Sequence, residues 1–181
     1  MDELDHFARL GLPRRFSLNP DEAERHYLAR SRELHPDFHQ LGSTSQQSAS
    51  LELTSRLNEA YATLRDSFRR AEYLLKLEGG PSASEQKEMP AEFLEEMLDL
   101  RMEIEELRQA ESPDSPARSA MERRLSERRE KLLGEVDNEF ARLDQSAARA
   151  NVLRVIRQRL NALKYVQNLL RDLHSQESMG V

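Results

Sequence analysis

The sequence contains no cysteine and no tryptophan, and only 6% of its 181 residues are aromatic. Without cysteine, the chain cannot form disulfides, use a thiolate nucleophile, or hold zinc or an iron–sulfur cluster through thiolates. With so few aromatic residues, the core must be built mainly from leucine and alanine. The leucines recur at helical spacing, which predicts an all-α protein and argues against disorder.

Long apolar runs are also absent. No stretch approaches the roughly 20 apolar residues needed to span a bilayer. The start of the sequence, Met1-Asp2-Glu3, has neither the basic region nor the apolar region of a signal peptide. We therefore expect a soluble cytoplasmic protein that does not bind membranes.

The net charge of -6 argues against nucleic-acid binding. The most arginine-rich part, "RSAMERRLSERREK" (118–131), interleaves Glu with Arg at the spacing of helical neighbours. Such a pattern is typical of a solvated helix face with salt bridges. Neither feature indicates a nucleic-acid partner.

The clearest break in the sequence is Gly79-Gly80-Pro81, because glycine ends a helix and a following proline prevents its continuation. It predicts two domains, at 1–78 and 90–181, joined by a linker at 79–89. The periodicity of the first domain predicts a short helix near 3–10, a helix from 20 to about 35, a second long helix that starts near Thr44, and a closing helix in "FRRAEYLLKLEGG" (68–80). That of the second predicts a three-helix bundle, with helices near 90–110, 115–145 and 148–174.

The helix near 20–35 begins at a good N-cap, Asn19, followed by proline at the first helical position. It should stop at His35, because Pro36 disfavours helical geometry in the residue before it. The next helix has its apolar stripe at Leu53, Leu57, Ala60, Tyr61 and Leu64. Two such helices form an antiparallel hairpin with His35-Pro36-Asp37 at its tip.

Three readings of this tripeptide come from the residues alone. His35, Asp37 and His39 could bind a metal ion, but Pro36 interrupts the helix and no third histidine has a suitable spacing. His35 and Asp37 could form an acid–base pair, yet no nucleophile elbow, phosphate loop or cofactor fingerprint accompanies them. The third reading is a loop whose polar residues cap helix ends.

A His-Pro-Asp triad at a hairpin tip, in an N-terminal domain of about 80 residues, resembles a J domain. The resemblance implies that His35, Pro36 and Asp37 dock on a DnaK-type chaperone and stimulate its ATP hydrolysis. Arg25 and Arg32, on the helix before the triad, are expected to contribute to that contact. This helix is less basic than is usual in the family, because Glu residues alternate with its arginines.

The segments "RAEYLL" (70–75) and "FLEEMLDLRMEIEEL" (93–107) narrow the resemblance to the HscB-type co-chaperones of iron–sulfur cluster assembly. Such proteins have a J domain and a C-terminal three-helix bundle in an L-shaped arrangement. The resemblance implies a non-enzymatic, bacterial cytoplasmic protein without cofactor or metal. Its expected partners are an HscA-type chaperone and the scaffold protein, IscU type, on which clusters are assembled.

The helix near 90–110 shows a possible binding surface independently of the resemblance. Phe93, Met97, Leu100, Ile104 and Leu107 lie within about 40° of one line and supply the core. An apolar ridge of Leu94, Leu98 and Met102 lies about 100° to 180° away from Phe93, and an acidic rim of Glu95, Asp99 and Glu106 lies at about 200° to 240°. The ridge either packs on another helix of the bundle or binds a protein partner with a basic surface.

In the family, the scaffold-binding face is an apolar and acidic patch on this helix, with an aromatic residue from the last helix. By motif match, the resemblance implies that Leu94, Glu95, Leu98, Asp99, Met102, Glu106 and Tyr165 bind the scaffold. Glu95 is acidic where an apolar residue is common, and Met102 is apolar where an acid is common. Two other functions stay open: a J protein with a different client, and a metal-dependent enzyme using His35, Asp37 and His39.

Overall fold

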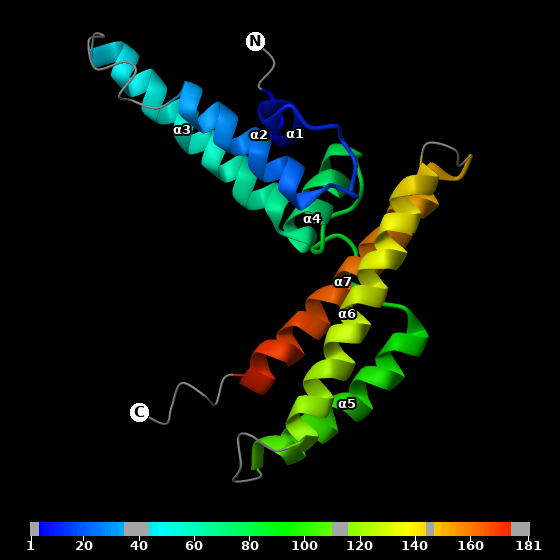
Figure 1. Ribbon diagram of the computed structural model, residues 1–181. Helices are drawn as coiled ribbons and strands as arrows, with labels where there is room; N and C mark the ends of the chain where they lie inside the picture. Colours follow the sequence, from blue (N-terminus) through cyan, green and yellow to red (C-terminus); the bar gives the residue numbers. More distant parts are fainter. Residues whose placement is uncertain (1–3, 35–43, 110–115, 144–146, 175–181) are drawn as a thin grey trace. The chain divides into compact units, whose positions relative to one another are not determined.

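The computed structural model describes residues 4–34, 44–109, 116–143 and 147–174 (Figure 1). Within these ranges it contains seven α-helices and no strand, which confirms the predicted all-α class. The chain divides into two compact units, one up to Leu74 and one from Leu75 onward. The finer limits at 1–78, 79–89 and 90–181 stay predictions.

Four helices lie wholly or mainly in the N-terminal unit: α1 (His6–Leu10), α2 (Pro20–Glu33), α3 (Thr44–Arg65) and α4 (Ser67–Leu77). The start of α2 is fixed by the predicted cap, because the Asn19 side chain accepts hydrogen bonds from the backbone N–H groups of Asp21 (2.9 Å) and Glu22 (3.3 Å). These bonds satisfy N–H groups that have no partner within the helix.

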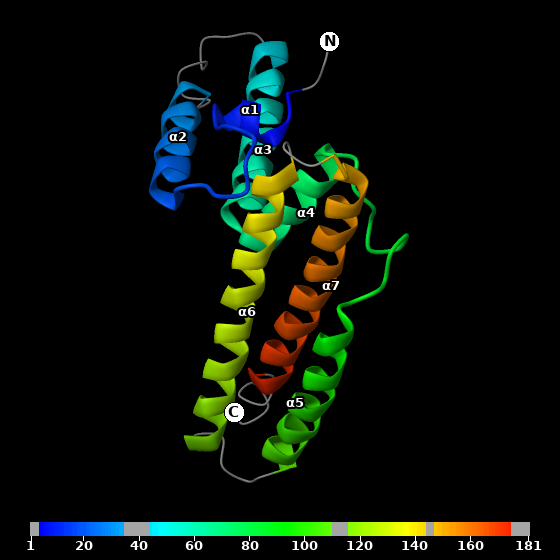
Figure 2. The same ribbon diagram turned by 90° about the vertical axis from the view of Figure 1, so that its right-hand side faces the viewer.

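Helices α2 and α3 run side by side in opposite directions (Figures 1 and 2). The Tyr27 ring on α2 stacks on the Tyr61 ring of α3, with centroids 4.2 Å apart. The Tyr27 hydroxyl donates to Asn58 Oδ1 at 3.0 Å. The apolar side chains buried in this unit include Phe7, Leu10, Ala23, Leu57, Ala60 and Leu64. The predicted hairpin is therefore present, while its tip, 35–43, lies outside the described residues.

Helix α4 ends as the glycine signal predicts. Gly79 has φ of 75°, and its N–H donates to the Lys76 carbonyl at 3.1 Å. The Gly80 N–H donates to the Leu75 carbonyl at 2.9 Å. This pair of bonds satisfies the last carbonyls of the helix, and a left-handed residue such as Gly79 is the usual C-terminal stop.

The C-terminal unit contains a three-helix bundle of α5 (Ala91–Gln109), α6 (Pro116–Arg142) and α7 (Arg149–His174). Helix α7 lies beside both other helices, and α6 runs opposite to them (Figure 2). The buried apolar residues include Phe93, Met97, Leu100, Ile104, Leu125, Leu132, Ile156, Leu160, Leu163 and Val166. The predicted bundle is therefore confirmed, with part of its core on the predicted face of α5.

The segment before α5 is bound to α7 by hydrogen bonds. The Gln86 side-chain amide, nearly buried, donates to the Arg154 carbonyl at 3.1 Å. The Asn161 side chain donates to the carbonyls of Gln86 and Glu88, each at 2.9 Å. Part of the predicted linker therefore folds against the bundle and leads directly into α5.

Candidate protein-binding sites

The triad His35-Pro36-Asp37 and the further metal-ligand candidate His39 lie outside the described residues. The predicted basic contacts, Arg25 and Arg32, are described and exposed on α2. They are seven residues apart and so lie on one helix face, and neither makes an ion pair or hydrogen bond with a described residue. Their chaperone contact stays a prediction.

The end of α2, directly before the triad, is anchored to α3. The Leu34 carbonyl accepts a hydrogen bond from the Ser50 hydroxyl at 2.7 Å. The Thr54 hydroxyl lies 3.4 Å from the same carbonyl and donates to the Ser50 carbonyl at 2.8 Å. Ser50 itself is 5% exposed. A carbonyl at a helix C-terminus has no partner within the helix, so the Ser50 hydroxyl satisfies it and fixes where the chain leaves α2.

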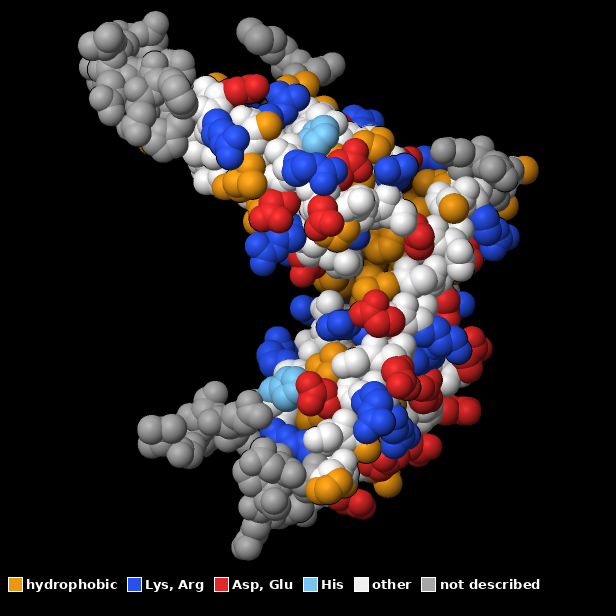
Figure 3. All heavy atoms as spheres, in the orientation of Figure 1, with side chains coloured by type: hydrophobic (Ala, Val, Ile, Leu, Met, Phe, Trp, Pro, Cys, Tyr) orange, Lys and Arg blue, Asp and Glu red, His pale blue; other side chains and the backbone are white. Residues whose placement is uncertain are grey.

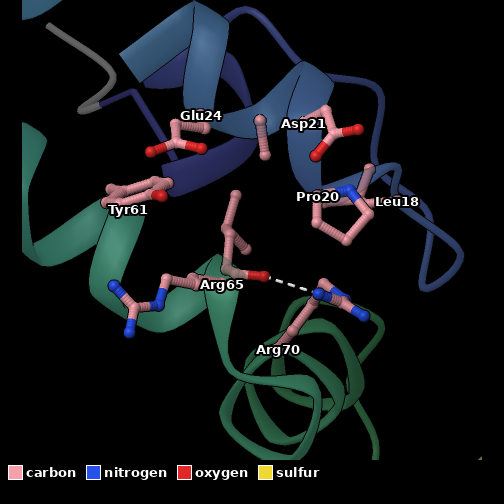
Figure 4. A pocket seen from close by; sticks show the side chains of 9 residues that line it. Leu18, Pro20, Asp21, Glu24, Tyr61, Arg65 and Arg70 are labelled. Atoms are coloured by element: carbon pink, nitrogen blue, oxygen red, sulfur yellow. Dashed lines mark hydrogen bonds between the residues drawn. The ribbon is translucent and has the colours of Figure 1, made fainter. Parts of the chain in front are cut away.

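A hollow of about 290 Å³ lies in the N-terminal unit (Figure 4). Asp21 and Glu24 of α2 line one side, and Arg65 of α3 and Arg70 of α4 line another. The Arg70 guanidinium donates to the Leu64 carbonyl at 2.6 Å, and Figure 4 shows this bond. The hollow lies between the start of α2 and the end of α3. It is therefore at the opposite end of α2 from the end that leads into the triad.

The predicted apolar ridge of the C-terminal unit is exposed on α5. Leu94 is 49% exposed, Leu98 61% and Met102 59%. By contrast, Phe93 and Met97, which face the bundle, are almost fully buried. A neighbouring helix therefore does not cover the ridge, and large apolar side chains stay open to solvent along one face of α5.

Five of the acids of α5 fall into two groups that differ in their partners. Glu96 pairs with Arg128 at 3.0 Å and Glu103 with Arg124 at 2.6 Å, both on α6. The acidic rim of Glu95, Asp99 and Glu106 is exposed and makes no ion pair with a described residue. In Figure 3, Asp and Glu side chains of this unit gather along the edge where α5 lies. The rim therefore leaves three carboxylates free for a basic partner.

Tyr165 meets the ridge in a second hollow of about 140 Å³. The residues that line this apolar hollow are Met89, Phe93, Leu94, Met97, Leu98, Arg101 and Tyr165. The structure thus brings three of the predicted scaffold-binding residues, Leu94, Leu98 and Tyr165, to one place. Met102 and the acidic rim lie on the same helix but do not line the hollow.

The aromatic wall of the hollow is held from α6. The Arg128 guanidinium lies 5.4 Å from the centre of the Phe93 ring, within the range of a cation–π contact. Arg128 also pairs with Glu96, as above, and its side chain is only 14% exposed. Phe93 and Tyr165 are in turn in contact. A charged side chain of one helix therefore supports the ring of the second and, through it, the ring of the third.

Two residues of the hollow were not predicted from the sequence. Met89 falls in the predicted linker, where no periodicity marks a buried face. Arg101 is one of two arginines in a mostly acidic helix. Its position about 80° around the helix from Phe93, between Met97 and Leu94, was available as a signal. A helical wheel that followed charged residues as well as apolar ones would have placed it beside the ridge.

No group of three or more His, Cys, Asp or Glu residues in the described part of the chain is arranged to hold a metal ion. None of its helices is both long enough and apolar enough to pass through a membrane. Within these ranges, the exposed ridge with its acidic rim and hollow is the candidate protein-binding surface.

Comparison with known proteins shows which family the C-terminal segment matches. Residues 89–174 match a family described as the HSCB C-terminal oligomerisation domain. The matched residues include α5, α6 and α7 in full, and with them all seven predicted scaffold-binding positions. The segment that carries the candidate binding surface is therefore the segment that matches this family.

Two solved structures have the same fold over nearly the whole chain. Chaperone HscB from Vibrio cholerae superposes with a TM-score of 0.79 and 24% identity, covering 98% of this chain and 100% of its own. The human co-chaperone protein HscB gives a TM-score of 0.79 and 22% identity, covering 98% of this chain and 84% of its own. The resemblance predicted from the sequence is confirmed, by fold over both units and by family match over the bundle.

Proposed function

We propose that this chain, an HscB-type protein by its C-terminal domain and its fold, is a non-enzymatic co-chaperone of iron–sulfur cluster assembly. Its J domain stimulates ATP hydrolysis by a specialised DnaK/HscA-type chaperone. Its C-terminal bundle binds the IscU-type scaffold protein and delivers it to that chaperone. The observation that carries the proposal is the exposed ridge of α5, which meets Tyr165 in a hollow and is flanked by three unpaired carboxylates.

The scaffold contact follows from the chemistry of that surface. Exposed leucines and a methionine give up water when a partner covers them, which favours association by about 25 cal/mol per Å² of apolar area buried. The acidic rim adds charge complementarity, which accelerates encounter with a basic surface and excludes acidic ones. The scaffold is therefore expected to present an apolar patch within a basic surround.

The chaperone contact is assigned to the N-terminal unit. The triad performs no chemistry of its own. The chaperone binds His35, Pro36 and Asp37 together with the two basic residues of α2, Arg25 and Arg32. The two arginines have no acidic partner among the described residues, so their charge is available to an acidic chaperone surface. The anchoring of Leu34 by Ser50 presents the triad from a fixed helix end.

An adaptor of this kind couples arrival of the client to hydrolysis. The chain has no cysteine, so it cannot take the cluster from the scaffold through thiolate ligands. Its contribution is to hold scaffold and chaperone at the same time. We propose that it works in the bacterial cytoplasm, where the chaperone and the scaffold act.

The test is single-turnover ATP hydrolysis by the chaperone, with this protein alone and then with scaffold added. We expect stimulation that grows when scaffold is present. His35→Gln should abolish stimulation and leave scaffold binding intact. Leu94→Ala combined with Leu98→Ala should abolish scaffold binding and leave basal stimulation intact, so that each variant is the control for the other.

Other outcomes would identify a different function. Stimulation without any effect of the scaffold would leave a J protein with another client. If both variants lost both activities, the two-site arrangement would be wrong. Absence of stimulation, together with stoichiometric metal that is lost in His39→Ala, would point instead to the metal-dependent enzyme.

A further inference from the structure

Arg101 is an unpaired cation at the edge of the apolar hollow. It is exposed on α5 and makes no ion pair or hydrogen bond with a described residue. By contrast, Arg124 and Arg128 of α6 both pair with acids of α5. Residues 85–111 contain ten acidic and three basic side chains, so carboxylates are abundant around it. A guanidinium beside a hollow, without a partner of its own, is available to an anion on another molecule.

The charges of this face are arranged across the ridge. Counting about 100° per residue from Phe93, Arg101 lies at about 80°, Leu98 at about 140° and the acidic rim at about 200° to 240°. The rim side of the ridge is therefore anionic. The side at the hollow carries Arg101 and, at about 120°, Glu105, which has an interaction of its own. A uniformly basic partner would match the rim but would be repelled at Arg101.

The hollow itself has room for one apolar side chain. Its volume of about 140 Å³ is close to that of an engineered protein cavity of about 150 Å³ that binds benzene. Met89 and Met97 line it, and methionine side chains adjust readily to the shape of what they contact. A leucine, isoleucine or methionine side chain of a partner fits these dimensions.

We infer that the apolar hollow receives one aliphatic or methionine side chain of the scaffold and that Arg101 pairs with a carboxylate beside that side chain. This inference rests on the proposed function and specifies the partner's surface. The scaffold then presents three features in order: basic residues facing the acidic rim, an apolar residue entering the hollow, and an Asp or Glu facing Arg101. A guanidinium binds a carboxylate through two parallel hydrogen bonds, which fixes orientation as well as charge.

The test is whether reversing the charge at position 101 strengthens or weakens scaffold binding. Arg101→Glu makes the face more acidic, so general attraction to a basic scaffold would strengthen binding. A specific Arg101–carboxylate pair predicts the opposite, a loss of affinity of roughly tenfold. The control is Arg123→Glu on α6, because Arg123 is also exposed, has no described partner and does not line the hollow. Arg123→Glu should strengthen binding, because it only makes the protein more acidic and so adds to the general attraction to a basic scaffold.

The measurement is calorimetric titration of the full chain with scaffold, followed by scaffold variants in which each surface Asp or Glu is changed to Lys. One such change should restore binding to Arg101→Glu while weakening binding to the unchanged protein. Arg101→Gln should lose a smaller part of the affinity. Binding of Arg101→Glu that equals or exceeds that of the unchanged protein would overturn the inference, and so would a loss that no scaffold charge reversal restores.

Different results would contradict the proposed function and the role of Arg101. If the unchanged protein does not bind scaffold, the proposed function is wrong and the inference falls with it. If the unchanged protein binds, and Leu94→Ala with Leu98→Ala removes binding while Arg101→Glu does not weaken it, the proposed function stands and only the role of Arg101 is wrong.

Discussion

The rings of Phe93 on α5 and Tyr165 on α7 meet in a T-shaped contact, with centroids 6.1 Å apart and planes at 85°. Phe93 is fully buried, while Tyr165 is partly open to solvent and lines the apolar hollow. Edge-to-face pairs of this kind are favourable and directional. The orientation of the exposed ring is therefore set by a core residue before any partner arrives, which lowers the entropic cost of binding.

Replacement of Tyr165 tests whether its ring or its hydroxyl matters. Tyr165→Phe keeps the T-shaped contact and should bind scaffold nearly as well as the unchanged protein. Tyr165→Ala removes the ring from the hollow and should weaken binding by about tenfold or more, as at aromatic hot spots of interfaces. Calorimetric titration with scaffold measures both. Equal affinity of the alanine variant would remove Tyr165 from the binding surface.

Arg128 should matter more for stability than a neighbouring arginine in a similar ion pair. Its side chain is 14% exposed and lies over Phe93, so Arg128→Met leaves Glu96 without its partner and should lower the free energy of unfolding by about 1–3 kcal/mol. The matched control is Arg124→Met, whose side chain is 54% exposed and pairs with Glu103. It should cost about 0.5 kcal/mol or less.

Urea unfolding followed by circular dichroism measures both arginine variants. Equal losses would show that the contact of Arg128 with Phe93 adds nothing to an ordinary surface ion pair. A larger loss for Arg128→Met, together with weaker scaffold binding, would connect this side chain to the orientation of the hollow.

Ser50 should be needed for the triad to be presented correctly. Ser50→Ala removes the 2.7 Å hydrogen bond to the Leu34 carbonyl and should lower the stability of the hairpin by about 1 kcal/mol. ATPase stimulation should fall, because the helix end before the triad is less firmly held. Ser55→Ala, an exposed position on the same helix, is the control and should change neither quantity. Unchanged stimulation by Ser50→Ala would show that this anchor does not position the triad.

His6 makes the stability of the N-terminal unit depend on pH. Burial against Tyr73, whose ring is stacked on it at 4.2 Å, lowers the pKa of His6 below its ordinary value, and the nearby Glu59 only partly offsets this effect. The folded unit therefore binds fewer protons than the unfolded chain. The stability that neutral His6 provides is complete above the ordinary pKa, about 6.5, and is lost as pH falls below it.

The measurement is the free energy of unfolding between pH 7.5 and pH 5.5. We expect it to fall with decreasing pH in the unchanged protein and to fall less in His6→Phe, which keeps an aromatic ring against Tyr73. The Asp5 carboxyl does not contribute to the pH dependence between pH 5.5 and pH 7.5. Burial raises its pKa, but hydrogen bonds from Ala8 and Arg14 outweigh burial and lower it, so Asp5 stays ionised throughout. An identical slope in both proteins would exclude His6 as the cause.

The helices were predictable because their signals are local. Asn19 caps α2 and Gly79 stops α4, and the apolar period of α5 separates its buried line from Leu94 and Leu98. The period does not reveal which positions of an apolar stripe a neighbouring helix covers. Leu53 was placed in the apolar stripe of its helix but is 42% exposed.

Contacts between helices were less predictable. The segment 118–131 was interpreted as a solvated face with salt bridges along one helix, yet Arg124 and Arg128 reach across to α5 and Arg118 is 8% exposed. Charge spacing within a helix cannot show which neighbouring helix supplies a partner. For the same reason, the hollow itself, with Met89 in its wall, became visible only once α5 and α7 were placed together.

The hydrogen bonds that tie residues 86–88 to α7 have a consequence for protein engineering. Asn161 and the Gln86 side chain hold this stretch of backbone, and Met89 at its end lines the hollow. A truncated scaffold-capture module that began at Pro90 would discard the residues that finish its own binding surface. A module that began near Leu75 would keep them, and it would start within the final turns of α4, which already end in a complete glycine stop.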